Sequence, residues 1–224
     1  MIIVPLKTHL AGEVDGYYED VFLPEDAALE KTLQSMRDAD MPMINVSALQ
    51  GRFLKMLIEM SGAKRVLEIG TLAGYSAIWV ARGLPDDSEL VTLEIEKEYA
   101  DIAAENIAGA KLDKKIKIVV GDAEHTMPQL SGPFDFIFID ADKLRNPLYL
   151  ELSLKLSKPG TWIFADNVVR NGGILENPSK NEGVIGMRKF NEMVAADGRL
   201  EATAIQTIGA KGYDGFVLLK VKTL

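Results

Sequence analysis

The sequence predicts an α/β protein: a doubly wound, mostly parallel sheet of seven strands, with an antiparallel last strand and N-terminal helices that act as a lid. Two observations predict this class. From residue 64 onward, short apolar runs alternate with helical stretches, which is typical of a parallel sheet covered on both faces. Near the end of the chain, two apolar runs are joined by a glycine-rich connection, as in an antiparallel hairpin.

The N-terminal part of the chain is expected to be helical. Apolar side chains recur there three or four positions apart, first as Leu29, Leu33 and Met36 and then as Phe53, Leu54, Leu57 and Ile58. Pro24 and Pro42 interrupt this region, and Ser47 is placed to cap the second apolar stretch. We expect a single domain over residues 1–224, in which residues 1–60 form a helical lid or substrate region and residues 61–224 form the α/β core.

Within the core, strands and helices are expected in strict alternation. The parallel strands are expected at residues 65–70, 89–95, 115–121, 134–140 and 161–166. The helices are expected at 75–83, 97–110, 147–156 and 183–196. Residues 200–208 and 215–221 should close the sheet as a hairpin.

Composition excludes several kinds of site. The 224 residues include no cysteine and two histidines, which excludes a disulfide framework, an iron–sulfur cluster, a thiolate zinc site and a three-histidine zinc site. The net charge of −8 disfavours a nucleic-acid partner. No run of about 18 apolar residues indicates a membrane helix, and the short apolar start lacks the pattern of a secretory leader. We therefore expect a cytoplasmic protein without a nucleic-acid or membrane partner.

Carboxylates follow the parallel strands at the point where each strand ends. They are Glu68, Glu94, Asp122, Asp140 and Asp166, the last of which is followed by Asn167. Ligands of open parallel sheets bind beyond these carboxyl ends. At any single position a helix cap or a turn is an equally good explanation, because Asp and Asn favour both. A carboxylate after every parallel strand is harder to explain in that way and indicates a binding site.

The first half of this edge predicts a site for a methyl donor. Gly70 and Gly74 allow a sharp turn into a helix with unpaired N–H groups, but their spacing is not the G-x-G-x-x-G of dinucleotide enzymes. Glu68 would repel a pyrophosphate and attract an ammonium group. S-adenosylmethionine fits, because it joins an adenosyl group to an amino acid without phosphate. Glu94 would then accept the ribose hydroxyls and Asp122 the adenine amino group.

The second half predicts a divalent cation. Asp140, Asp166 and Asn167 offer carboxylate and amide oxygens, which are the ligands that Mg²⁺ and Ca²⁺ prefer. Two carboxylates and one amide leave coordination positions open for waters or for two substrate oxygens. Lys143 is placed to aim its amine at a substrate hydroxyl beside the cation, although a solvated surface lysine is the plainer interpretation of this residue taken alone.

These motifs carry a resemblance to a known family. The segments VLEIGTLAGYS at 66–76, TLEIE at 92–96, FIDADK at 138–143 and ADNV at 165–168 resemble class I S-adenosylmethionine-dependent O-methyltransferases, specifically the metal-dependent catechol and caffeoyl-CoA O-methyltransferase group. The resemblance runs from about residue 43 to residue 221 and implies a Rossmann-like methyltransferase fold and a homodimer. It implies that Asp140, Asp166 and Asn167 hold the metal, with Mg²⁺ as the first candidate and Ca²⁺ or Mn²⁺ as alternatives. It also implies that Lys143 assists hydroxyl deprotonation.

For the methyl donor, the resemblance implies that Glu68 grips the methionine portion, that Glu94 binds the ribose, and that Ser76 and Val46 contact the donor. The full set expected around the donor is Val46, Glu68, Gly70, Thr71, Ser76, Glu94, Asp122, Ala123 and Asp140.

Two departures from the family pattern lie near the expected substrate mouth. An acidic pair of the family is replaced by Leu49 and Gln50, and Asn146 stands where the family usually has an aromatic residue. These changes concern the choice of acceptor rather than the methyl donor or the metal.

The expected reaction is transfer of a methyl group from S-adenosylmethionine to one hydroxyl of a vicinal-dihydroxy aromatic, of the catechol or caffeoyl type. The cation would chelate the diol, and the N-terminal helices and the segment 170–181 would close over it. One alternative is a non-catalytic protein that binds the adenosyl ligand or the metal, since a fold does not determine function. A nicotinamide-dependent dehydrogenase is the other, but it leaves Asp140, Asp166 and Asn167 unexplained.

Overall fold

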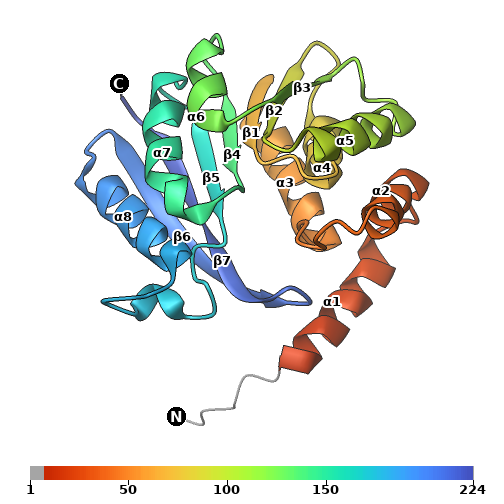
Figure 1. Cartoon of the computed structure of the whole chain (residues 1–224), viewed down its shortest axis with the longest axis horizontal. Coiled ribbons are helices and arrows are strands. Elements are labelled where there is room, and N and C mark those ends of the chain that lie inside the picture. The colour runs from red at the N-terminus through yellow and green to blue at the C-terminus, as the bar shows by residue number, and fades with distance from the viewer. Residues whose placement is uncertain (1–7, 224) are drawn as a thin grey trace.

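The structure is a computed structural model that describes residues 8–223 (Figure 1). The apolar stretch at residues 1–7, which was expected not to be a secretory leader, lies outside the described residues. Three helices precede the first strand: α1 (Thr8–Phe22), α2 (Ala27–Asp38) and α3 (Ala48–Ser61). The predicted cap is present, because Ser47 accepts a hydrogen bond from the Gln50 backbone N–H at 3.2 Å. None of the helices in the described residues is long and apolar enough to cross a membrane.

Seven strands form one mixed sheet, as predicted. They are β1 (Arg65–Ile69), β2 (Glu89–Glu94), β3 (Ile116–Val120), β4 (Phe136–Ile139), β5 (Trp162–Asp166), β6 (Leu200–Gly209) and β7 (Gly212–Val221). Their order is β3-β2-β1-β4-β5-β7-β6, and the first five are parallel. The antiparallel strand is β7, the last in the chain, which lies between β5 and β6 and leaves β6 at the edge.

Helices cover both faces of the sheet (Figure 1). On one face, α3 packs with α4 (Tyr75–Gly83) and α5 (Lys97–Gly109). On the other lie α6 (Ala123–Thr126), α7 (Asn146–Lys155) and α8 (Glu182–Ala196). Three short 3₁₀ turns complete the chain: η1 (Met127–Gln129), η2 (Lys143–Arg145) and η3 (Gly173–Leu175).

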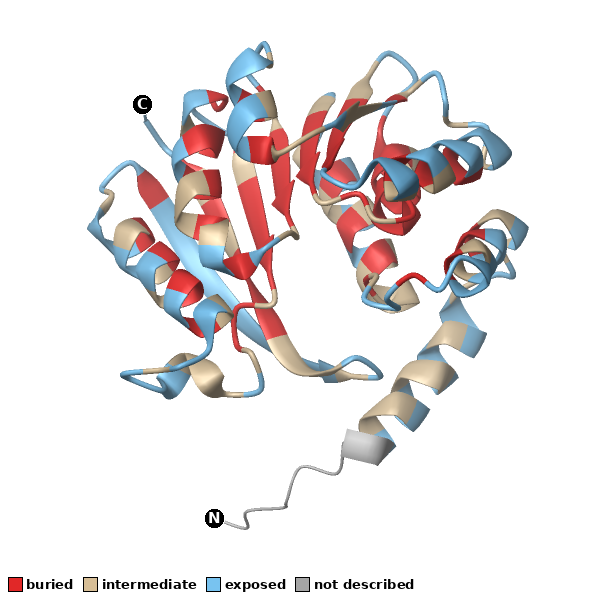
Figure 2. Ribbon diagram, in the orientation of Figure 1, coloured by how far each residue is buried: buried red, intermediate tan, exposed pale blue. Residues whose placement is uncertain are grey.

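The two faces follow from alternation along the strands. In β4, Phe136 and Phe138 pack with the α3–α5 layer, whereas Ile137 and Ile139 pack with the α7–α8 layer. All four are buried, because a parallel strand covered on both faces has no solvent side (Figure 2). The edge strand β6 is the opposite case, since most of its residues are exposed.

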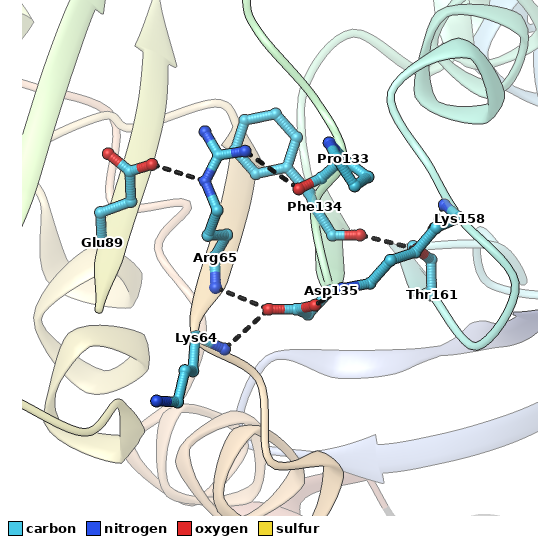
Figure 3. Close-up of polar contacts among 8 residues, drawn as sticks. All are labelled: Lys64, Arg65, Glu89, Pro133, Phe134, Asp135, Lys158 and Thr161. Carbon is cyan, nitrogen blue, oxygen red and sulfur yellow. Dashed lines mark hydrogen bonds and ion pairs between the residues drawn. The ribbon is translucent and has the colours of Figure 1, made fainter. Parts of the chain in front are cut away.

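The amino-terminal ends of the central strands are tied together by polar contacts (Figure 3). Asp135 Oδ2 accepts hydrogen bonds from the backbone N–H groups of Lys64 at 2.9 Å and Arg65 at 2.8 Å, which joins the start of β4 to the start of β1. Arg65 in turn pairs with Glu89 at the start of β2, with 2.7 Å between Nε and Oε1. This edge is therefore fixed by the protein's own groups, and the opposite edge is left for ligands.

Candidate active site

A cavity of about 990 Å³ opens at the carboxyl ends of the parallel strands. This volume is at the upper end of the roughly 300–1,000 Å³ of small-molecule sites, so two small ligands fit. All of the predicted site residues border the cavity except Glu68: Val46, Gly70, Thr71, Ser76, Glu94, Asp122, Ala123, Asp140, Lys143, Asp166 and Asn167. The structure therefore brings residues from five strand ends and from the segment before α3 into one site.

The turn from β1 into α4 brings the backbone close to the next strand end. Gly70 has φ +104°, and a Cβ at this position would collide with the backbone oxygen of Asp140. Gly74, with φ +85°, occupies the N-cap position of α4. It has no side chain that could accept a hydrogen bond from the first N–H groups of the helix. Because Tyr75 and Ser76 begin this helix and border the cavity, its first N–H groups face the ligand space.

Glu68 lies behind this turn and is fully buried. Its Oε2 accepts a hydrogen bond from the Thr92 hydroxyl at 2.6 Å, and the Thr71 hydroxyl lies 2.6 Å from that of Thr92. Its other oxygen, Oε1, has no hydrogen-bond partner among the described residues. Burial raises the pKa of Glu68 to about 7, and the charges of Asp140 and Glu94 add to the rise. A buried carboxylate with an open oxygen is suited to a cationic ligand.

Glu94, at the end of β2, also accepts hydrogen bonds from the protein backbone. Its Oε2 accepts from the Leu72 backbone N–H at 2.7 Å, and its Oε1 accepts from the Glu96 N–H at 3.0 Å. Each carboxylate oxygen has a second lone pair, so the group can still accept hydroxyls from a ligand. Glu94 therefore fixes the loops after β1 and β2 while it borders the cavity.

Asp122 is held by Arg145, a residue that the sequence analysis did not single out. Its Oδ2 accepts from Arg145 Nη1 at 2.9 Å, and its Oδ1 caps α6 by accepting from the Glu124 N–H at 2.9 Å. The Arg145 hydrogen bond is the main reason that the pKa of Asp122 is lowered. Asp122, Glu124 and His125 are the one group of three potential metal ligands among residues 8–223 found within 4.8 Å of one another. Glu124 also pairs with Arg145, and His125 is exposed, so this group is a surface ion-pair network.

On the other half of the edge, Lys143 and Asp140 form a close pair. Lys143 Nζ lies 2.7 Å from Asp140 Oδ1, and the lysine side chain is 8% exposed. The alternative of a solvated surface lysine is therefore wrong. Asp142 positions the lysine by capping η2, in which Lys143 is the first residue.

Asp166 is buried at the end of β5, with 4% of its surface exposed. Its Oδ1 accepts from the Asn167 backbone N–H at 2.8 Å, and its Oδ2 accepts from the Gln50 side-chain amide at 2.6 Å. Burial raises the pKa of Asp166 to about 7, the charge of Asp140 adds to the rise, and Lys143 opposes it. A carboxylate disfavoured by burial and by a like charge is one that a bound cation would stabilise.

Comparison with known proteins identifies the chain. Residues 21–221 match the model of the family described as O-methyltransferase. The chain belongs to the O-methyltransferase family. The resemblance inferred from its motifs is thereby confirmed, and the protein is an S-adenosylmethionine-dependent O-methyltransferase.

Relatives of this methyltransferase match it over nearly their whole length. It is 46% identical over 221 residues to a catechol O-methyltransferase of Niastella koreensis. That alignment covers 97% of this chain and 100% of that protein. It is 42% identical over 211 residues to a catechol O-methyltransferase of Mycobacterium tuberculosis, in an alignment that covers 94% of this chain and 96% of that protein. A solved structure of an O-methyltransferase from Bacillus cereus, in complex with SAH, superposes with a TM-score of 0.94 at 48% identity, over 96% of this chain and 100% of that one.

The two departures from the family pattern have different surroundings in this methyltransferase. Gln50 borders the cavity and contacts Asp166, whereas Leu49 is half-buried and does not border it. Asn146 was expected near the substrate mouth, and this was wrong. It is fully buried at the start of α7, with Nδ2 2.8 Å from Met187 Sδ, because α7 turns this side chain toward α8.

Sequence reasoning also missed residues that the fold brings to the cavity from far along the chain. Arg170 follows the predicted metal set by a few residues, and Lys211 lies in the short turn between β6 and β7. Neither belongs to a motif. Only the position of Arg170, inside the expected lid segment 170–181, gave a signal in the sequence.

Proposed function

We propose that this methyltransferase transfers a methyl group from S-adenosylmethionine to one hydroxyl of a vicinal-dihydroxy aromatic, of the catechol or caffeoyl type. In this proposal Asp140, Asp166 and Asn167 bind a divalent cation, with Mg²⁺ as the first candidate, and Lys143 assists deprotonation of the acceptor. The catechol O-methyltransferase names of its relatives support the acceptor class.

The residues around β1 and β2 fit the donor. The open oxygen of buried Glu68 suits the ammonium of the methionine portion, and the uncapped N-terminus of α4 suits its carboxylate. Glu94 retains free lone pairs for the ribose hydroxyls. The solved relative from Bacillus cereus, which is in complex with SAH, supports the binding of such a donor.

The observation that carries the metal proposal is the state of Asp166. Asp166 is a buried carboxylate beside Asp140, with its pKa raised to about 7 by burial and by that neighbour, and the charge of Lys143 offsets this only in part. Asn167 adds an amide oxygen at the same strand end, so the donor set is the oxygen-only kind that Mg²⁺ prefers. When bound, such a cation would lower the pKa of an acceptor hydroxyl and fix its direction.

The chain's own residues accept the proton, align the two substrates and exclude water. Lys143 is buried beside Asp140 and, in its neutral amine form, receives the hydroxyl proton at Nζ. The strand ends hold donor and acceptor roughly 3 Å apart and aligned for in-line displacement. Val46 and the segment before α3 border the cavity from above the sheet edge and help to exclude water. In this role residues 1–60 act as the lid of a single domain.

A labelled-methyl assay tests the proposal. With catechol as acceptor, turnover should require a divalent cation and stop with a chelator, whereas phenol with a single hydroxyl should not be methylated. Asp166→Ala should abolish turnover while leaving the dissociation constant for S-adenosylmethionine nearly unchanged, because the donor contacts lie on the other half of the sheet. Chelator-resistant methylation of phenol at the rate of catechol would overturn the metal mechanism.

We also propose that the methyltransferase is a homodimer, as the family resemblance implies. Large apolar side chains on its N-terminal helices are exposed, including Tyr17 at 62%, Phe22 at 61% and Met60 at 80%. The rings of Tyr18 and Phe22 stack on α1, and exposed apolar groups that lie together favour a protein partner. Light scattering of the purified protein measures the mass directly, and a monomer at micromolar concentration would refute a stable dimer.

A further inference from the structure

The positive charges that border the cavity fall into two kinds. Lys143 and Arg145 form ion pairs with neighbouring carboxylates. Arg170 and Lys211 border the same cavity, yet within residues 8–223 neither of them forms an ion pair. The protein has a net charge of −8 and its cavity bears several carboxylates, yet these two cations pair with none of them.

Arg170 is held in an unfavourable backbone conformation. Its φ is +54°, in the left-handed region that residues with a Cβ rarely adopt. The segment is fixed from β7, because Asp214 Oδ1 accepts hydrogen bonds from the Val169 N–H at 2.9 Å and the Arg170 N–H at 3.0 Å. Strain that the surroundings maintain in this way is characteristic of functional sites. It fixes the backbone from which the guanidinium reaches the cavity.

Lys211 is anchored at the tip of the β6–β7 hairpin. Its Nζ donates a hydrogen bond to the Met43 backbone oxygen at 3.1 Å, and the preceding Ala210 N–H donates to Asp15 Oδ2 at 2.7 Å. These contacts join the tip to α1 and to the segment before α3. An ammonium has three N–H donors, so two remain for a ligand. Lys211 is itself exposed, so a ligand can reach these donors. Burial of part of its surroundings lowers the pKa of Lys211.

The two residues come from neighbouring segments. The Asn171 N–H donates to the Tyr213 backbone oxygen at 3.1 Å, which ties the chain after Arg170 to the chain after Lys211. Arg170 also follows Asn167 within the same loop. Arg170 therefore follows the proposed metal ligands in the same loop, and Lys211 lies in the segment that is tied to this loop.

We propose that Arg170 and Lys211 bind an anionic group of the acceptor, so that the preferred substrates are vicinal-dihydroxy aromatics with a carboxylate-bearing substituent. This inference rests on the proposed function, since the diol must bind at the metal. Guanidinium and ammonium groups bind carboxylates by charge-assisted hydrogen bonds. The two residues thus determine specificity without contacting the reacting atoms.

The test compares acceptors that differ only in charge. The pairs are 3,4-dihydroxybenzoate with its amide and 3,4-dihydroxycinnamate with its amide, assayed with Mg²⁺ for kcat/KM. The wild type should favour the acid in at least one pair. In Lys211→Gln and in Arg170→Gln the acid-to-amide ratio should fall about tenfold, mainly through KM. Lys189→Gln, which removes an exposed charge of α8 outside the cavity, should keep the wild-type ratio. Comparing ratios between variants cancels the different intrinsic acidities of acid and amide.

The results distinguish a failure of the proposed function from a failure of the proposed anion site. If none of the four diols is methylated, the proposed function fails. If all four are methylated and the acid-to-amide ratio is the same in the wild type, in Lys211→Gln and in Arg170→Gln, the function stands and the recognition of an anion is refuted. An acid-to-amide ratio that declines with rising salt in the wild type, and declines less steeply in Lys211→Gln, supports the inference independently, because salt screens an exposed ionic contact.

Discussion

Gln50 donates its side-chain amide to Asp166, with Nε2 2.6 Å from Oδ2. The contact joins the first turn of α3 to the end of β5 and holds the most buried carboxylate of the proposed metal set. A glutamine at this position gives Asp166 a hydrogen bond without adding a third carboxylate. The segment before the sheet therefore influences the metal site through one neutral amide.

Gln50→Glu should change how stability depends on metal. Without a cation, the new carboxylate faces Asp166 and should destabilise the fold by about 1–2 kcal/mol, which lowers Tm by roughly 2–6 °C. With a cation, the extra negative charge should strengthen binding, so the rise in Tm on adding Mg²⁺ should exceed that of the wild type. Thermal unfolding in chelator and in Mg²⁺ measures both effects. Gln129→Glu, at an exposed position outside the cavity, is the matched control, and an identical response of the two variants would contradict the prediction.

Glu94→Ala should weaken donor binding by roughly 2–4 kcal/mol, because it removes a charged acceptor for two ribose hydroxyls. It should also lower Tm, since the N–H groups of Leu72 and Glu96 lose their acceptor. Calorimetric titration with S-adenosylmethionine separates the two effects, and metal binding should persist. An unchanged dissociation constant together with a lowered Tm would mean that Glu94 serves only the backbone.

Glu68 should make the ligand-free protein less stable as pH rises. Its folded-state pKa of about 7 lies above the ordinary 4.5, so the folded state binds more protons in this window. The stability that this group contributes is therefore largest below pH 4.5 and is lost as pH rises through about 7. Glu68→Gln removes the effect, and the free energy of unfolding of the variant relative to wild type should increase by up to about 3 kcal/mol between pH 5 and pH 8. Urea unfolding at the two pH values measures this difference, and a difference of zero would show that the carboxylate is not perturbed.

Asp135 should contribute to the stability of the fold and not to the affinity for donor or metal. It lies at the edge of the sheet opposite the cavity and accepts from two backbone N–H groups (Figure 3). Burial favours a higher pKa, but Lys158 and these two donors outweigh it, so the pKa of Asp135 is lowered and its contribution fades as pH falls below about 4. Asp135→Ala should cost about 1–3 kcal/mol in urea unfolding at pH 7. Donor and metal affinities should stay at the wild-type values, and a loss of either would show coupling between the two edges.

Most of the fold could be predicted because buried parallel strands are continuous apolar runs, which mark their own limits in the sequence. The boundaries that differ have local causes. The fourth strand begins at Phe136 rather than at 134, because the Phe134 N–H pairs with Leu156 rather than with a strand. β7 begins at Gly212 rather than at 215, because Tyr213 and Asp214 continue the pairing with β6 despite their polarity.

The site was predictable where topology alone brings residues together, and not where the decisive contact joins distant segments. Strand ends of a parallel sheet meet at one edge, so their carboxylates could be placed from the sequence. Arg145 beside Asp122 and Lys211 beside Met43 depend on how loops fold back, and no spacing in the sequence encodes those pairs. The prediction for Asn146 was wrong for a related reason, since a family pattern fixes the position in the chain and the local helix decides which way the side chain points.

Lys143→Ala should lower kcat more than it raises KM, because Nζ acts on the proton during the reaction rather than on the bound acceptor. The variant should recover part of its rate at higher pH, where the acceptor hydroxyl ionises without help. Removing the lysine also leaves Asp140 without its partner at 2.7 Å, so metal affinity must be measured alongside, and it should not fall. Lys143→Arg keeps the positive charge beside Asp140 but cannot accept a proton, and it should therefore share the loss of kcat. A wild-type rate in Lys143→Arg would assign the lysine an electrostatic role only, and a rate that does not recover with pH in Lys143→Ala would contradict its role in proton transfer.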